Sequence, residues 1–299
     1  MKITTCCLWL MIISLAFTFP VSAQTVTWDD LMQSGNQALT QNRPAEAEQS
    51  FRDALKLIEK SGDKDPRKPV TLIKLAAACD LQSKRDEAET LANQSLLALE
   101  KVPLLSKTQG TTDALAGVNV TLQLYDQAAG LFVSHQKYAE AETTYQKAIT
   151  YCDKTLSLAS NSKSNDELVK SLALLTTDVE QGQANAHDKL GSVYFLQKKY
   201  DLAEVAFHKS LKLREKLFQP TSSPIAESLA NLATLFAVQA KYDKAEPLYK
   251  QALDIFEQTN SMNQPKALYI LGNYVLLLKK TGREAEAKAL LEKTKAQSK

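Results

Sequence analysis

The sequence predicts an all-α protein in which about six helical hairpins stack into one solenoid. Glycine and proline are scarce, with 9 of each among 299 residues, and this scarcity favours long helices over a sheet with many turns. A short alanine-centred motif recurs six times along the chain. Around each copy, small and apolar residues stand at helical offsets, so each copy predicts a pair of helices.

The composition limits the class of protein. The hydrophobic fraction of 44% and the charged fraction of 23% are those of an ordinary soluble protein, which excludes disordered, collagen-like and multi-span membrane classes. The 36 basic and 34 acidic side chains leave a net charge of +2. Because so small a charge gives no field to hold a polyanion, we expect no nucleic-acid partner.

The first segment, residues 1–23, is predicted to be a secretory signal peptide. A basic start precedes an apolar run from Cys6 to Phe19, and small residues at Val21 and Ala23 place the cleavage after Ala23. The run is 14 residues long, short of the roughly 20 that a membrane-spanning helix needs. An uncleaved anchor is the alternative. After cleavage we expect no stable membrane span.

Two cysteines, Cys79 and Cys152, belong to the expected mature chain, residues 24–299. A disulfide is chemically possible in an exported protein. However, Cys79 follows Leu72, Leu75 and Ala76 in an apolar helical pattern, where a free cysteine behaves as a small hydrophobe. We therefore expect free cysteines.

The repeated motif aligns on an alanine that has a basic residue four positions before it. Residues four and seven positions after the alanine share its helix face. Twelve positions before it stands a residue that is small in nearly every copy, so an upstream helix can approach closely. We predict that the six anchor alanines pack between the two helices of each hairpin: Ala47, Ala88, Ala141, Ala203, Ala245 and Ala287.

The hairpins follow in order along the chain. They are predicted near residues 28–61, 69–102, 122–155, 184–217, 226–259 and 268–299. The anchor alanines are separated by 41, 53, 62, 42 and 42 residues. Apolar residues near 111–121 and 165–183 recur at offsets of three and four, so the long steps predict extended first helices, the second with a possible break at Gly182. The last helix, 284–297, is rich in lysine and glutamate, as a solvated end should be.

These residues resemble the tetratricopeptide repeat. The resemblance covers about residues 28–297 and is carried best by 229–236 with 241–253, and by 190–194 with 199–204. It implies a right-handed α-solenoid. Steps of 42 are similar to the longer repeats of kinesin light chains, and residues 217–226 resemble the linker of that subgroup, although Ser223 replaces its usual histidine.

No catalytic site, metal site or cofactor site is predicted. The histidines are His135, His187 and His208, and no pair has the spacing of adjacent metal ligands. His187 occupies a position that is Leu or Tyr in other copies, which favours a packed helix residue. Gly-rich phosphate loops are absent from the sequence. A hydrolase or transferase hidden in the inserted residues, 101–121 and 161–183, is disfavoured because these segments lack histidine.

A polar stripe is predicted on the first helices, which line the concave face of a hairpin solenoid. Amide side chains donate and accept hydrogen bonds, so a row of them can satisfy the backbone of an extended peptide. By resemblance, Asn231 and Asn273 match the groove asparagines of kinesin-light-chain repeats. An ordinary solvated stripe is the alternative. The stripe comprises Gln33, Lys74, Gln127, Lys189, Asn231 and Asn273, of which the last four are predicted to bind peptide.

The two ends of the array differ in charge. Residues 24–64 hold five basic and seven acidic side chains, whereas residues 262–299 hold eight and three. The basic end either favours acidic partners or head-to-tail contact, or is a solvated cap. We expect a non-enzymatic scaffold that binds a protein or peptide, with a self-associating structural protein of the cell envelope as the alternative. By analogy with exported repeat proteins, the chain is expected in a bacterial periplasm or outside the cell.

Overall fold

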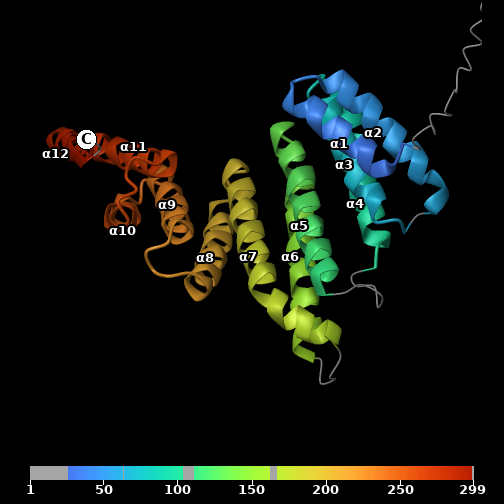
Figure 1. Ribbon diagram of the computed structural model, residues 1–299. Coiled ribbons are helices and arrows are strands. Elements are labelled where there is room, and N and C mark those ends of the chain that lie inside the picture. The colour runs from blue at the N-terminus through green and yellow to red at the C-terminus, as the bar shows by residue number, and fades with distance from the viewer. Residues whose placement is uncertain (1–25, 63, 104–110, 162–166, 298–299) are drawn as a thin grey trace, which may run out of the picture.

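The computed structural model describes residues 26–62, 64–103, 111–161 and 167–297, and this part of the chain is helical without a strand. The all-α prediction is confirmed. Successive hairpins lie beside one another from the blue end to the red end of the array (Figure 1). The predicted signal peptide lies outside the described residues. The helices are α1 (Trp28–Thr40), α2 (Pro44–Ile58), η1 (Glu59–Ser61), α3 (Arg67–Asp80), α4 (Arg85–Lys101), α5 (Thr111–Ser134), α6 (Tyr138–Asn161), α7 (Glu167–Leu196), α8 (Tyr200–Leu217), α9 (Ser223–Val238), α10 (Tyr242–Gln258), α11 (Pro265–Lys280) and α12 (Glu284–Gln297).

Each odd-numbered α-helix forms a hairpin with the next helix, and all six hairpins turn in the same way. The residue five positions before each anchor alanine has a positive φ, between 56° and 76° in every turn. The backbone N–H of the following basic residue donates to a carbonyl of the first helix, as from Lys241 to Phe236 at 2.9 Å. This left-handed closure satisfies carbonyls at the helix end. The residues at this position are Asn42, Ser83, Gln136, Lys198, Ala240 and Gly282.

The anchor alanines lie where the two helices of each hairpin meet. None of the six is more than 1% exposed. Where the small residue of the first helix is glycine, a phenylalanine of the second helix lies directly over it. A Cβ added at Gly191 would stand 2.7 Å from Cδ1 of Phe207, and one at Gly35 would stand 2.4 Å from Cε1 of Phe51. These glycines allow a contact that any side chain would block.

In the two long repeat steps, residues 111–121 and 167–183 are helical, whereas residues 104–110 and 162–166 lie outside the described part of the chain. α5 begins at Thr111, and α7 runs without a break from Glu167 through Gly182 to Leu196. At Gly182 a Cβ would stand 2.4 Å from Cδ1 of Leu122, so α5 and α7 approach closely there. The close packing of α7 against α5 explains why a glycine occurs at this position inside α7, where the helix is not broken.

Ion pairs join consecutive hairpins at one repeated position. At four of the five junctions between hairpins, the glutamate directly after the anchor alanine contacts the basic residue four positions before the next anchor. At the fifth hairpin that basic residue, Lys241, lies over the ring of Phe236 at 5.9 Å. The pairs and their N to O distances are Glu48 with Lys84 at 2.6 Å, Glu89 with Lys137 at 3.6 Å, Glu142 with Lys199 at 3.0 Å, and Glu246 with Arg283 at 2.6 Å.

Both cysteines of the described chain, Cys79 and Cys152, are free and buried. Burial raises the pKa of Cys79 to about 11 and that of Cys152 to about 12, so both remain thiols at neutral pH. Among residues 26–297 as described, no helix has the length and apolar character to cross a membrane.

Candidate protein-binding groove

The predicted polar stripe is distributed over four first helices. Gln127 of α5 and Lys189 of α7 are exposed, whereas Asn231 of α9 and Asn273 of α11 are partly buried. The Nδ2 atom of Asn273 is buried and makes no hydrogen bond within the described residues. A buried amide donor without an acceptor is uncommon, because its desolvation is not repaid. These four residues therefore do not form a uniform exposed row.

The first helices instead enclose a cleft, which we call the α5–α7–α9 cleft. Its volume is about 600 Å³, and it reaches the second helices α6 and α8 between them. Of the four predicted peptide-binding residues, only Lys189 lines it. The remaining polar lining residues are Asn119, Gln123, Asp126, Tyr145, Asp178, Gln181, Asn185, Asp188, Arg214 and Glu227.

One wall of the cleft is a hydrogen-bonded cluster around Arg214. Nη1 of Arg214 donates to Oγ of Ser228 at 2.8 Å and to the carbonyl of Pro224 at 3.1 Å, and Nη2 donates to Oδ1 of Asn185 at 3.2 Å. Asp188 lies 3.7 Å from the guanidinium through its Oδ1 atom. The cluster thus fixes the end of α8 against α7 and the start of α9.

Asp188 connects this cluster to the predicted stripe. Its Oδ1 atom accepts a hydrogen bond from Nδ2 of Asn231 at 2.9 Å. Burial raises the pKa of Asp188, although the Arg214 charge and the Asn231 hydrogen bond oppose this rise. The desolvation of this carboxylate is only partly compensated. A further cation in the cleft therefore stabilises its charged form.

Sequence reasoning missed both Asp188 and Arg214. Arg214 stands eleven positions after its anchor alanine, and the corresponding residues in other hairpins are Ile58, Leu99, Cys152 and Phe256. A charged residue at a position that is otherwise apolar is a signal that the repeat alignment contained. Asp188 is marked less clearly, because the corresponding residue is Ala230 in the fifth hairpin but Asp126 in the third.

The charge of the cleft is negative. Four of its lining side chains are acidic and two are basic, and one of the basic groups, Arg214, is already committed to the cluster. Asp126 accepts a hydrogen bond from the Tyr145 hydroxyl at 3.1 Å, and Glu227 pairs with Lys266 at 2.6 Å. The cleft is therefore suited to a partner that brings positive charge.

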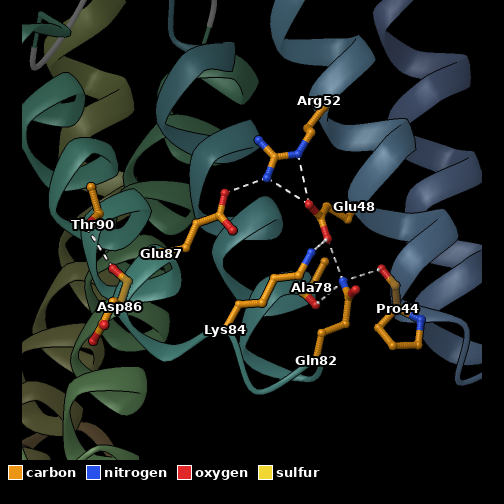
Figure 2. A network of polar contacts seen from close by, with 9 residues as sticks. All are labelled: Pro44, Glu48, Arg52, Ala78, Gln82, Lys84, Asp86, Glu87 and Thr90. Carbon is orange, nitrogen blue, oxygen red and sulfur yellow. Dashed lines mark hydrogen bonds and ion pairs between the residues drawn. The ribbon is translucent and has the colours of Figure 1, made fainter.

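A second polar cluster lies between α2 and α4 (Figure 2). Arg52 bridges Glu48 and Glu87 at 2.7 and 2.5 Å, and Lys84 contacts Glu48 from the other side (Figure 2). The Cys79 sulfur lies within 4.8 Å of carboxylate oxygens of both glutamates, a spacing that three metal ligands can have. Two cations already neutralise these carboxylates, and the thiol keeps its proton. The cluster is an ion-pair joint between the first two hairpins.

Comparison with known proteins agrees with this architecture. A tetratricopeptide-repeat family model matches residues 182–258 and 225–299. A search of curated protein sequences finds no match. BtubC (BKLC) from P. vanneervenii is a similar solved structure, with a TM-score of 0.58 at 16% identity over 91% of each chain.

Two further solved structures are similar. A tetratricopeptide repeat protein from Parabacteroides merdae has a TM-score of 0.52 at 18% identity, over 91% of this chain and 80% of its own. The kinesin-light-chain-like repeats of Podosopora anserina have a TM-score of 0.54 at 16% identity, over 78% of this chain and 95% of their own. At such identities the likeness concerns the fold alone.

The stacked hairpins and the cleft between their first helices define a helical-repeat protein with the form of a protein-interaction scaffold. Residues 182–299 match the tetratricopeptide-repeat family model, and the fold of the described chain is similar to that of solved repeat structures of this kind.

Proposed function

We propose that the chain is an exported, non-enzymatic scaffold that binds an extended segment of another protein in the α5–α7–α9 cleft. The single observation that carries this proposal is a cleft of about 600 Å³ lined by amides and carboxylates, at the junction of three first helices. Amides provide donors and acceptors for a peptide backbone, while carboxylates select side chains. The position of the cleft beside the predicted stripe supports the same site.

The segment is proposed to carry a basic side chain. Asp178 and Asp188 stand on one face of α7, and Asp126 faces them from α5 across the cleft. A lysine or arginine placed among these carboxylates offsets the desolvation of Asp188 and gains from the charge of the others. An acidic segment would meet the opposite field and be excluded.

Fluorescence anisotropy with three labelled 12-residue peptides tests this proposal. The peptides share one Ser/Ala framework and carry either two arginines, two glutamates or no charge. The arginine peptide should bind the mature chain best at low salt, and Asp188→Asn should weaken it because the charge is lost while an acceptor for Asn231 remains. Asp201→Asn, at an exposed position of α8 outside the cleft, is the matched control and should leave peptide binding unchanged.

Two results would contradict the proposed site. Equal binding of all three peptides would remove the charge preference, and equal weakening by Asp188→Asn and Asp201→Asn would place the contact elsewhere. Replacing both Asn231 and Asn273 by Ala examines the predicted stripe. We expect weaker capture with unchanged helicity, because Asn231 orients the Asp188 carboxylate.

Export is proposed from the sequence of residues 1–23. Expression of the full chain in a bacterium should deliver it beyond the inner membrane with Gln24 as its first residue, whereas removal of residues 1–23 should retain it in the cytoplasm. Cell fractionation followed by N-terminal sequencing measures both. Retention of the full chain in the cytoplasm would reject the proposal, and an exported chain that starts at Met1 would identify an anchor.

Self-association is a second candidate that one observation favours. Leu268 and Gly272 of α11 are exposed, although the corresponding Ala226 and Ala230 of α9 are only 0% and 4% exposed. Leu276 continues the same exposed stripe at 53%. Sedimentation velocity over a hundredfold concentration range should show dimers that Leu268→Lys with Leu276→Lys abolishes. A monomer throughout would remove this candidate.

A further inference from the structure

A second and larger cavity lies between the second and third hairpins, and we call it the α4–α5 cavity. Its volume is about 1070 Å³. It lies at the first long repeat step, where α4 ends at Lys101 and α5 begins at Thr111. This cavity is separate from the α5–α7–α9 cleft and shares no lining residue with it.

The α4 and α5 walls of the α4–α5 cavity are largely apolar, whereas α6 contributes Thr143, Gln146 and Thr150. The α5 wall is one helix face that runs through Gly117, Val120, Thr121 and Leu124, at helical offsets. Val120 is 39% exposed, an unusual exposure for a valine in an interhelical space. The opposite walls are formed by Pro66, Pro69, Leu99, Val102 and Pro103, and the floor includes the tilted ring pair of Tyr125 and Tyr151, whose centroids are 6.3 Å apart.

The polar rim of the cavity is basic. Lys64, Lys101, Lys147 and Lys154 line it, against the single carboxylate of Glu100. Glu100 is paired with Lys147 at 2.7 Å, and Lys64 and Lys154 add positive charge to the rim. Lys64 comes from the segment before α3 and Lys154 from α6, which places cations on two sides of the opening.

We propose that the α4–α5 cavity binds a small amphipathic anion, a molecule with an apolar body and one carboxylate or sulfonate head. The apolar walls accept the body, and the lysines of the rim hold the head. Small-molecule sites usually enclose about 300 to 1000 Å³, so this cavity has room for a drug-sized or fatty-acid-sized ligand. The charge of the rim selects an anion over a neutral hydrocarbon.

The fluorescent probe 8-anilinonaphthalene-1-sulfonate has this chemistry, and N-phenyl-1-naphthylamine is the same hydrocarbon without the sulfonate. The folded mature chain should bind one sulfonate probe with enhanced fluorescence, and dodecanoate should displace it better than dodecanol. Lys64→Gln with Lys154→Gln should weaken the sulfonate probe roughly threefold to tenfold and the neutral probe hardly at all. Loss of both probes to the same extent would overturn the role of the rim.

Two glycines of α5 give a matched pair that locates the site. No atom lies within 4 Å of a Cβ added at Gly117 or at Gly130, so both accept a larger residue, but only Gly117 lines the cavity. Gly117→Phe should abolish probe binding, and Gly130→Phe should preserve it, with equal helicity for both. Equal binding by the two variants, or no binding by the parent chain, would overturn the proposal.

Discussion

Asn231 of α9 donates its amide Nδ2 to Oδ1 of Asp188 on α7 across 2.9 Å, and this bond joins the fifth hairpin to the fourth. The sequence predicted Asn231 as a residue that meets a peptide directly. The structure gives it a partner within the chain. Asn231 is therefore expected to affect binding indirectly, by orienting the Asp188 carboxylate. The other oxygen of that carboxylate is the one expected to meet a peptide in the cleft.

The Arg214 cluster predicts a large loss of stability when the arginine alone is removed. Arg214→Phe, which copies Phe256 of the next hairpin, leaves Asp188 partly buried beside an apolar ring and should cost about 3 kcal/mol or more. Adding Asp188→Ala, which copies Ala230, should recover most of that loss because no charge is left without a partner. Urea unfolding of the two single variants and the double variant measures this. Additive losses would show that the two side chains are not coupled.

The same substitution, glycine to alanine, is expected to change the stability of the chain in opposite directions at two positions of the first helices. Gly191→Ala places a Cβ 2.7 Å from Phe207 and should destabilise the chain by roughly 1 to 3 kcal/mol through overpacking. Gly272→Ala meets no atom within 4 Å and should stabilise α11 by about 0.5 to 1 kcal/mol. Denaturant midpoints give the comparison. A gain at Gly191 would refute the close helix contact drawn there.

The left-handed turns predict where glycine stabilises. Ala240 has a φ of 57°, a conformation that costs an L-residue roughly 1 to 2 kcal/mol. Ala240→Gly removes that strain, and after the entropy of the unfolded chain is counted, a net gain of about 0.5 kcal/mol is expected. Ala237→Gly, three residues earlier within α9, should instead lose about 1 kcal/mol. Thermal unfolding separates the two, and a loss at both positions would argue against the turn.

His187 predicts a pH dependence of stability. Burial, with a smaller effect of Lys209, lowers the pKa of this imidazole to about 4, and Asp153 opposes the shift. The unfolded chain takes up a proton near pH 6.5 and the folded chain does not, so stability is full above pH 6.5 and falls as the pH drops toward 4. His187→Leu, which copies the leucine of four other hairpins, should flatten the pH dependence of the free energy of unfolding between pH 7 and 5.

The matched variant for that measurement is His208→Gln, at an exposed position of α8, which should keep the slope of the parent chain. Glu48 and Glu246 do not interfere. Their pKa values are about 2, so the stability they contribute is lost only between about pH 4.5 and 2. An unchanged slope in His187→Leu would show that this imidazole is protonated in the folded chain.

The fold was predictable because its determinants are local. An alanine and the residues four and seven positions after it share one face of one helix, and the small residue twelve positions before it lies across a short turn. All of these positions can be compared between copies without knowing how the hairpins stack. The turn itself carried no common signal, since Asn, Ser, Gln, Lys, Ala and Gly all occupy its left-handed position. The turn closes because the two helices pack, and the packing imposes the backbone on whichever residue is there.

The candidate site was only partly predictable. The alignment placed Lys189 and Asn231 on the first helices, but it could not show that the cleft opens between α5 and α7. That opening depends on how two helices of unusual length lie against each other. Arg214 was visible as a charge at an apolar position, yet its partners come from two other helices, α7 and α9.

The sequence by itself determined the number of hairpins, the buried face of each helix and the lack of a predicted catalytic motif. Only the tertiary structure decided which charges meet. Glu48 pairs with Lys84, 36 positions away, and Glu142 pairs with Lys199, 57 positions away. The physical reason is that helical periodicity reports contacts along one helix, whereas the pairing of charges between hairpins depends on the stacking angle and on the inserted length that only the folded chain contains.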